Sequence, residues 1–535
     1  MRLDDWFLTP EERANPATEI DRRRAPPAAW SVGNDVTVWL DGAGYFGHLE
    51  QVLVDLDEAS TVWFTDWDGN ADERLSGSGS EVGPLLTRLA ERGVQICGLL
   101  WRSHPRQAQF SEQDNMALVR EVNRRGGLLA LDERVRRGGC HHQKLVVIRR
   151  PARLGPDLAF VGGIDLCHGR HDDADHLGDP QAVRLSDRYG ARPPWHDVHL
   201  AVEGPAVDDV AWSFAERWND PARLDHRNPV RAFLRWRNHQ PRRLPPVEVP
   251  IGSPSTTGTS AVQVLRTYPS RRPRYPFAPD GERSVARAYL KAIGRARSLV
   301  VLEDQYFWSV EMARALAKAL RGNPSLRLVI VVPRHPDQDG AVTGNVSRMA
   351  RERALAIVTA AGGDRVAVFD LENRLGTPIY VHAKVCIIDD VWMEIGSDNL
   401  NRRSWTHDSE IGCAVIDERR DDREPTDPGG RGDGARVLAR ETRLRLWCEH
   451  LGRVGGDDHD IVDPQQAFEV LRASARRLDA WAAAPAPRGE RPAGHLRPHR
   501  LQAVPWWGRP FLAIVYRLFV DPDGRPLRLR RSRTY

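Results

Sequence analysis

Two His-x-Lys pairs are the residues of this sequence best suited to chemistry. His142 and Lys144 form the first pair, and His382 and Lys384 form the second, 240 positions later. In an extended segment, residues two apart point to the same side, so each imidazole and ammonium would face one site together. A neutral imidazole is a nucleophile and general base near neutral pH, and an ammonium attracts a phosphate group. The two pairs therefore suit chemistry on a phosphate ester.

The use of lysine at these positions strengthens this interpretation. The chain has 77 basic residues but only four lysines, Lys144, Lys291, Lys318 and Lys384, so half of its lysines belong to the two pairs. A single His-x-Lys is common and is usually not catalytic, whereas two at matching places in a repeat call for a shared role. If surface charge were the only requirement, arginine would serve there as it does elsewhere in the chain.

The segments around the two pairs repeat one another. In each half, a buried strand ending in an acidic residue is followed by a helix, a second strand, a further helix and a third strand. The matching strands are 59–67 and 297–305, 94–101 and 326–333, and 126–133 and 364–371; the matching helices are 84–93 and 312–322. Short apolar strands that alternate with amphipathic helices are typical of α/β domains with both sheet faces covered. We predict two similar α/β/α sandwich domains with mixed, mostly parallel sheets, packed as a pseudo-dimer with the active site at their interface.

Composition divides the chain into five segments. The predicted segments are an N-terminal extension at 1–29, the first repeat at 30–235, a linker at 236–260, the second repeat with C-terminal helices at 261–480, and a Pro-rich stretch with an aromatic and basic tail at 481–535. The linker is rich in Pro, Ser, Thr and Gly. A second stretch, 418–436, is charged and rich in Gly and Pro, so we expect it to be disordered.

The charge and cysteine content limit the function classes. The 535-residue chain carries 77 basic and 73 acidic residues, a net charge of +4 at pH 7, so no nucleic-acid partner is expected. Six cysteines without a CxxC pair indicate a reducing compartment. No apolar run reaches the ~20 residues of a membrane-spanning helix, and the N-terminus lacks the apolar stretch of a signal peptide. We therefore predict a cytoplasmic protein.

The residues after the second pair extend the pattern. His382, Lys384 and Asp389 form HxKxxxxD, and Gly396-Ser397-Asp398-Asn399 follows as GSxN. This combination resembles the signature of the phospholipase D superfamily. The chain is similar to the phospholipase branch of that superfamily at HHQK (141–144), GGIDLCHGRHD (162–172), PWHDVHLAVEGPAVDDV (194–210) and EDQYFW (303–308). The resemblance extends over roughly residues 30–475.

The first copy departs from this pattern. Arg149 stands where the second copy has its motif aspartate, and the follow-up motif is GGID at 162–165, a variant seen in first repeats of phospholipases of this family. In the family the motif aspartate braces the motif and does not react. The resemblance therefore implies a weakened brace at the first copy and an intact reaction centre.

The resemblance implies a two-step reaction at phosphorus. One histidine attacks phosphorus and forms a phosphohistidine, while the other protonates the leaving alcohol and then activates the incoming water or alcohol. It assigns His142 as the nucleophile and His382 as the acid and base. An acidic residue orients each imidazole, Glu410 for the second copy and Asp197 for the first, and Asp389 completes the second motif. No metal and no other cofactor is required.

Further residues of the two motifs are expected to hold the phosphate. They would bind the nonbridging oxygens and stabilise the charge of the transition state. Lys144 and Lys384 join the catalytic set for this reason, and the other expected phosphate-binding residues are Ser397, Asn399, Gly163 and Asp165.

Three other segments have weaker signals. HGRHDDADH at 168–176 has three histidines and three aspartates, which would suit Zn²⁺ or Ca²⁺, but a polar loop beside the active site is the preferred interpretation. The Gly-rich stretch 77–83 does not open a helix after a strand as GxGxxG, so it is a weak nucleotide site. The tail 501–535 combines paired tryptophans, an apolar stretch at 511–520 and clustered arginines, which is typical of a peripheral membrane contact. Packing of 511–520 on the body of the protein is an equally favoured alternative.

These features together predict a monomeric two-repeat enzyme that acts on a phosphodiester of a glycerophospholipid. In the simplest reaction a phosphatidylcholine-type lipid and water give phosphatidic acid and an alcohol. The alternatives are phosphatidyl transfer as in cardiolipin synthesis, a nuclease of the same superfamily, and a catalytically impaired lipid-binding scaffold. The small net charge argues against the nuclease, and the two intact His-x-Lys pairs argue against the scaffold.

Overall fold

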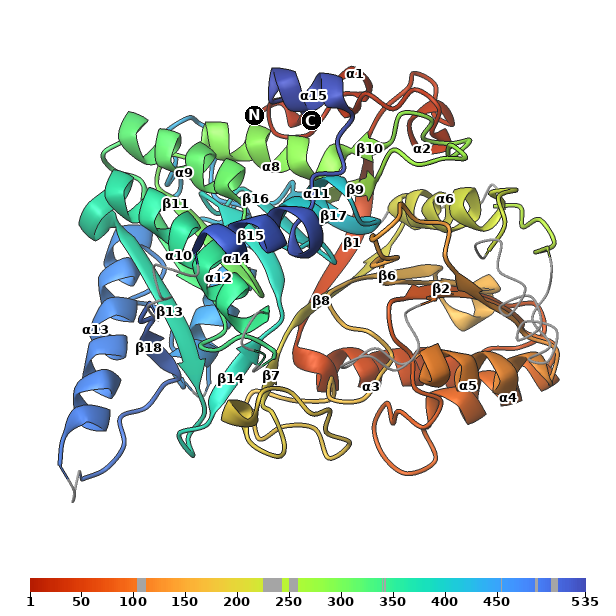
Figure 1. Cartoon of the computed structure of the whole chain (residues 1–535), viewed down its shortest axis with the longest axis horizontal. Coiled ribbons are helices and arrows are strands. Elements are labelled where there is room, and N and C mark those ends of the chain that lie inside the picture. The colour runs from red at the N-terminus through yellow and green to blue at the C-terminus, as the bar shows by residue number, and fades with distance from the viewer. Residues whose placement is uncertain are drawn as a thin grey trace.

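The computed structural model describes residues 1–102, 112–224, 243–249, 258–338, 340, 343–453, 455–485, 489–501 and 509–535. Figure 1 shows two α/β halves side by side, the first coloured orange to yellow and the second green to blue. Each half is built on a mixed sheet of seven main strands.

The first sheet combines three parallel strands with four antiparallel ones. The parallel pairs are β2–β3 and β3–β4, and every other pairing in this sheet is antiparallel. From one edge to the other the order is β4 (Leu128–Asp132), β3 (Gln95–Trp101), β2 (Thr61–Asp66), β5 (Leu145–Arg149), β6 (Leu158–Gly162), β8 (Val198–Glu203) and β1 (Ser31–Leu40).

The second sheet matches the first strand for strand. Its order is β13 (Val366–Glu372), β12 (Arg327–Val331), β11 (Leu299–Asp304), β15 (Lys384–Ile388), β16 (Trp392–Gly396), β17 (Glu410–Asp417) and β9 (Ser260–Tyr268). Parallel pairing again joins only the first three of these. Edge strands β1 and β9 pair with each other in antiparallel fashion and so join the two sheets.

Four short strands complete the pairings. They are β7 (Trp195–His196), β10 (Glu282–Arg283), β14 (Pro378–Val381) and β18 (Leu496–Pro498). The pair that matters for function is β7 with β14, because it runs in parallel between the two repeats.

Helices pack on both faces of each sheet. In α4, Val82, Leu85, Leu86 and Leu89 are buried and recur at helical spacing, so one stripe of the helix packs on the sheet. The helices of the first repeat are α3 (Asp41–Val54), α4 (Val82–Glu91), α5 (Glu112–Asn123) and α6 (Ala206–Trp218). Those of the second are α8 (Ser284–Arg295), α9 (Val310–Gly322), α10 (Thr343–Gly362), α11 (Arg402–Thr406), α12 (Val437–His450) and α13 (Pro464–Ala483). The termini add α1 (Pro10–Arg13), α2 (Glu19–Arg22), α14 (Arg509–Val515) and α15 (Leu527–Ser532).

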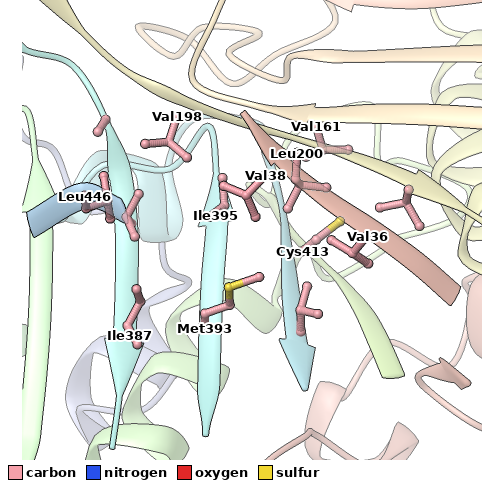
Figure 2. Close-up of a cluster of buried hydrophobic side chains, with 14 of the residues drawn as sticks. Val36, Val38, Val161, Val198, Leu200, Ile387, Met393, Ile395, Cys413 and Leu446 are labelled. Atoms are coloured by element: carbon pink, nitrogen blue, oxygen red, sulfur yellow. The ribbon is translucent and has the colours of Figure 1, made fainter. Parts of the chain in front are cut away.

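The largest apolar cluster draws on both sheets. Figure 2 shows Val161, Val198 and Leu200 of the first sheet in the same cluster as Met393, Ile395 and Cys413 of the second. All of them are buried. The apolar side chains of both repeats are therefore removed from water together, which stabilises the two halves as one unit.

The predicted α/β class, the mixed sheets and the repeated strand and helix positions are confirmed. Parallel pairing is limited to three strands of each sheet because tight connections such as β15–β16 allow only antiparallel neighbours. The linker prediction at 236–260 falls mostly outside the described residues. Among the described residues, no helix is long and apolar enough to cross a membrane.

The charged stretch 418–436 has a defined conformation, so the prediction of disorder is wrong. Arg440 of α12 donates to Asp421 at 3.0 Å, and the indole of Trp6 donates to Asp433 at 3.1 Å. Arg295 of α8 also forms an ion pair with Asp433 at 3.1 Å, so this stretch has partners both in the neighbouring α12 and far away in the sequence. Composition alone does not reveal such pairing.

Candidate active site

The two His-x-Lys pairs meet at one cavity. Lys144 immediately precedes β5, and Lys384 begins β15, so the two pairs occupy matching places in the two sheets. His142 and His382 both line a cavity of about 300 Å³. Each pair therefore supplies one imidazole to a single site.

Each imidazole contacts a carboxylate of the other repeat. His142 Nδ1 lies 2.8 Å from Glu410 Oε2, and His382 Nδ1 lies 2.6 Å from Asp197 Oδ2. This is the reverse of the sequence-based assignment, which gave Glu410 to the second copy and Asp197 to the first. Both contacts leave Nε2 as the nitrogen free to react at the cavity.

Backbone pairing between the repeats explains the crossed contacts. Strands β7 and β14 pair in parallel and end just before Asp197 and His382, so the two side chains emerge next to each other. A second parallel bridge joins His141 to Ser409, the residues just before His142 and Glu410. The arrangement is thus the same at both histidines, and it requires both repeats.

Both imidazoles are held neutral. Burial, followed by the two lysine ammoniums, keeps the pKa of His142 well below its ordinary value. Burial and then Lys384 lower the pKa of His382 to about 3, against the opposing effect of Asp197. An imidazole without a proton on Nε2 is the form needed for attack on phosphorus.

The two carboxylates differ in their protonation. Burial, and then the nearby charge of Asp408, raises the pKa of Glu410 to about 8. Burial opposes ionisation of Asp197 as well, but His382 and Lys384 outweigh it, and the pKa of Asp197 falls below its ordinary value. Asp197, which contacts His382, is therefore an anion at neutral pH, whereas Glu410, which contacts His142, is largely protonated.

The lysines are buried, and each is anchored by its own repeat. Lys144 Nζ donates to His142 O at 3.1 Å and lies 3.3 Å from Asp165 Oδ1. Lys384 Nζ donates to His382 O and, at 3.4 Å, to Gln305 Oε1. Burial and then Lys144 lower the pKa of Lys384 to about 8, so its charge is lost under mildly alkaline conditions.

Of the expected phosphate-binding residues, Asn399 lines the cavity. Its Oδ1 is buried without a hydrogen-bond partner among the described residues. Ser397 lies deeper, donating to Glu410 Oε2 at 2.6 Å and accepting the Ile411 N–H at 3.0 Å. These contacts fit support of Glu410 better than phosphate binding.

Gly163 and Asp165 also lie behind the reacting groups. The Gly163 N–H donates to Val198 O at 3.1 Å, so it is not available to a phosphate. A Cβ at this position would lie 2.1 Å from Asp197 Oδ1, which explains the glycine. Asp165 faces Lys144 and the Trp67 N–H, and a carboxylate has no donor for a phosphate oxygen. Both residues fit a positioning role.

The motif aspartate is remote from the cavity. Asp389 follows β15 at the end opposite His382 and accepts the N–H groups of Arg297, Ser298 and Leu299 at 2.7–2.8 Å. The motif groups Asp389 with the catalytic residues, but this carboxylate does not contact the reacting groups and lies where the bracing role implied by the resemblance requires it. At the matching position Arg149 contacts Asp208 of α6 at 2.6 Å and Asp157 at 2.9 Å, so a different ion pair braces the first copy.

Aromatic side chains form much of the cavity wall, and sequence reasoning did not single them out. Arg170 stacks on one of them, Trp195, at 4.0 Å. The quoted motif stretches contained Trp195, Tyr306 and Trp308, but nothing in a single sequence indicated which way they point. The aromatic lining residues are Trp67, Trp101, Trp195, Tyr306, Trp308 and Tyr380.

Comparison with known proteins identifies the family. A family model described as Phospholipase D matches residues 70–237 and 366–499, together more than half of the chain. The chain belongs to the phospholipase D family. A model described as Cardiolipin synthase, PLD-like domain, matches residues 289–422 of this family member.

Individual relatives of this phospholipase D family member are longer than the chain. Phospholipase D alpha 1 of Vigna unguiculata is 25% identical, with 76% of this chain and 62% of the relative covered. Phospholipase D beta 2 of Arabidopsis thaliana is 25% identical, with 77% and 56% covered. The chain thus spans about three fifths of their length. A solved phosphatidylserine synthase of Haemophilus influenzae shares 15% identity over 72% of this chain and 82% of that one, with a TM-score of 0.48.

Proposed function

We propose that this phospholipase D family member cleaves or exchanges the phosphodiester of a glycerophospholipid through a phosphohistidine. In hydrolysis, a phosphatidylcholine-type lipid and water would give phosphatidic acid and the free alcohol. The observation that carries this proposal is the convergence of His142 and His382 on one cavity, each braced by a carboxylate of the other repeat.

The first step transfers the phosphatidyl group to the enzyme. Nε2 of His142 attacks phosphorus, a P–N bond forms, and the bond from phosphorus to the head-group oxygen breaks. That oxygen takes a proton from His382, so the alcohol leaves neutral. In the second step His382 takes a proton from water, the hydroxide attacks phosphorus, the P–N bond breaks and phosphatidic acid leaves. A primary alcohol in place of water gives a transferred phosphatidyl group instead.

The two carboxylates explain why the histidines have different roles. Burial and then Lys384 lower the pKa of His382. Ionised Asp197 stabilises an imidazolium there, as an acid requires, and a bound phosphodiester would offset the charge of Lys384. Glu410, with its pKa raised to about 8, leaves His142 neutral and nucleophilic. Lys144, Lys384 and the amide of Asn399 would hold the nonbridging oxygens.

The cavity suits a lipid head group. Its volume of about 300 Å³ is that of a small-molecule pocket, which would take the phosphodiester and head group and leave the acyl chains outside. The aromatic lining favours a small organic head group. Transfer of the phosphatidyl group to a second lipid alcohol is the alternative reaction, and the match to the cardiolipin synthase model favours it.

The segment 509–520 would dock this site on a membrane. Leu512 and Tyr516 are buried in one cluster with Trp308, while the opposite side of the segment exposes large apolar side chains. Val520, at its end, lines the cavity, so the exposed patch adjoins the cavity mouth. Exposed Arg517 would favour an anionic surface. The exposed residues are Phe511 (61%), Ile514 (58%), Leu518 (63%) and Phe519 (71%). The paired tryptophans of the predicted contact lie outside the described residues.

Serine substitutions at these four positions test the docking surface. Deleting 501–535 would also remove buried Leu512, Tyr516 and Tyr535, so exposed positions give a cleaner test. The fourfold serine variant should lose about tenfold or more in binding to anionic vesicles, because each buried apolar side chain contributes about 1.5–3 kcal/mol. Turnover of a short-chain soluble substrate should be unchanged. Leu375→Ser, a 73% exposed position elsewhere, is the matched control. Equal vesicle binding by the fourfold variant and the wild type would refute the docking proposal.

Incubation with mixed phospholipids and a primary alcohol tests the reaction. Mass spectrometry of the lipids should detect phosphatidic acid and the phosphatidyl alcohol, and a lipid with two phosphatidyl groups would instead indicate transfer between lipids. His142→Ala and His382→Ala should each abolish product formation, because each repeat supplies one indispensable imidazole. More than a few per cent of activity in either folded variant would contradict the shared site.

A further inference from the structure

A second cluster of titratable side chains lies behind the active site, between the two repeats. It consists of Asp41 at the start of α3, His176 of the loop before β7, His196 of β7 and Glu449 of α12. One ligand atom of each residue lies within 4.8 Å of all the others. The two histidines are fully buried, and the carboxylates are nearly so. None of these side chains takes part in the proposed reaction.

The spacing of the four groups is that of a metal site. His196 Nδ1 lies 3.0 Å from Asp41 Oδ1 and 3.2 Å from Glu449 Oε1, and His176 Nε2 lies 3.3 Å from Glu449 Oε1. Ligand atoms of a tetrahedral Zn²⁺ with bonds of about 2.0–2.1 Å are about 3.3 Å apart. The same atoms could therefore surround one ion with little movement.

The outer partners orient both imidazoles toward the centre. The other nitrogen of His176, Nδ1, lies 3.1 Å from the Trp195 carbonyl oxygen. The other nitrogen of His196, Nε2, lies 2.9 Å from Glu303 Oε2, and Glu303 in turn contacts His450 at 2.8 Å. A carbonyl or carboxylate that accepts the distal N–H is the usual outer partner of a metal-bound histidine.

The contacts between the histidines and the carboxylates inside the cluster join acceptor atoms to acceptor atoms. Once each histidine donates its distal N–H outward, its inner lone pair faces a carboxylate oxygen, which also carries lone pairs. Such a contact is repulsive unless a proton or a metal ion lies between the two atoms. A second proton on the imidazole, a protonated carboxyl group or one divalent metal ion would supply it.

We propose that Asp41, His176, His196 and Glu449 bind one structural Zn²⁺-class ion that clamps the two repeats together. Two imidazoles and two carboxylates suit Zn²⁺, and four protein ligands leave no open position for catalysis. Asp41, His176 and His196 belong to the first repeat and Glu449 to the second, so the ion crosses their boundary.

The site would also position the catalytic pair. The His196 carbonyl accepts the His382 N–H at 2.7 Å, and His196 is the neighbour of Asp197. The Asp41 N–H donates to Asp197 O at 2.8 Å. A metal ion that holds His196 and Asp41 therefore holds the backbone on which Asp197 meets His382. It acts through these residues and does not touch the reacting atoms.

The histidine-rich segment 168–176 contributes only His176 to this cluster. His168 contacts Asp72 at 3.0 Å, and Asp172 accepts the Trp195 N–H at 2.8 Å, so the rest of that segment forms a polar loop. The preferred interpretation of 168–176 as a polar loop thus fits all of that segment except His176, and the other three residues of the cluster lie outside it.

Metal content and stability of the full-length protein test this proposal independently of activity. Purified protein should hold about one Zn²⁺ per chain, and protein refolded with a chelator should have a lower midpoint temperature that Zn²⁺ or Co²⁺ restores. The Co²⁺ form should show the visible absorption of tetrahedral cobalt without the thiolate charge-transfer band that a cysteine site would add. His176→Gln and Glu449→Gln should each lower the bound metal at least about tenfold. His168→Gln, a change of the same kind in the same segment, should retain it.

The wild-type measurements decide the question even if the ligand variants fail to fold. Less than about 0.1 equivalent of bound Zn²⁺ or Co²⁺, with no shift in midpoint temperature, would overturn the proposal and leave protonated histidines as the cations. A cobalt spectrum with thiolate character, or full metal retention in folded His176→Gln, would also overturn it by placing the metal elsewhere.

Discussion

Replacing Asp197 by asparagine should remove most of the acid catalysis at His382. The Asp197 carboxylate lies 2.6 Å from His382 Nδ1, is fully buried, and does not line the cavity. Asparagine keeps the size of the side chain but removes the negative charge that stabilises the imidazolium. The substrate would still bind, because Lys144, Lys384 and Asn399 are unchanged.

The magnitude follows from the contact that is lost. A hydrogen bond to a charged group contributes about 1.5–3 kcal/mol, and a unit charge pair 4 Å apart at an effective dielectric constant of 20 is worth about 4 kcal/mol. These values correspond to about a 10–10³-fold fall in kcat, with KM nearly unchanged. The same substitution in a serine protease triad costs about 10⁴-fold, which sets an upper limit.

The choice of leaving group makes the assay specific. An ordinary lipid alcohol needs a proton as it leaves, whereas a p-nitrophenyl phosphodiester leaves as an anion without one. Asp197→Asn should therefore lose much less activity on the p-nitrophenyl substrate than on phosphatidylcholine. Asp389→Asn is the matched control, because the same chemical change at a remote buried carboxylate should lower stability and leave kcat of the folded protein unchanged. Equal losses on the two substrates, or an equal fall in kcat for the control, would refute the assigned role of Asp197.

Three further outcomes are expected. The kcat/KM should fall above about pH 8, because the pKa of Lys384 is about 8 and its neutral form no longer attracts the phosphate; a profile that stays flat to about pH 10 would contradict this. Gly163→Ala should lower kcat about 10²-fold in steady-state assays, because its Cβ would lie 2.1 Å from Asp197 Oδ1 and displace that carboxylate; unchanged kcat would show that the site adapts. Arg149→Asp restores the aspartate of the family motif but should lower the free energy of unfolding by about 3 kcal/mol in denaturant titrations, because it sets a new carboxylate against buried Asp208. Equal or greater stability would show that the ion pair of Arg149 with Asp208 does not stabilise the first copy.

The sequence was sufficient to predict the class of fold and the two histidines that meet at the cavity. Residue type and spacing indicate which groups face one site, since an imidazole and an ammonium two residues apart on an extended segment share a side. The assignment of His142 as the nucleophile and of the phosphate-binding residues came from the family resemblance. Alternation of apolar strands with amphipathic helices is a local property, so the repeated order of elements could be derived from each segment separately. For the same reason the prediction of disorder at 418–436 failed, because Asp433 forms an ion pair with Arg295, 138 positions away, and accepts the indole N–H of Trp6.

Only the tertiary structure decided which groups act together. Glu410 contacts the histidine of the first repeat and Asp197 that of the second, because short parallel pairings between the repeats bring those segments side by side. Pairing of β6 with β8 within the first sheet puts Gly163 beside Asp197, so this position must lack a side chain. Packing of the two repeats brings Glu449 of the second to Asp41, His176 and His196 of the first. Contacts between residues more than a hundred positions apart depend on how the two sheets pack, and no local pattern in the sequence records that packing.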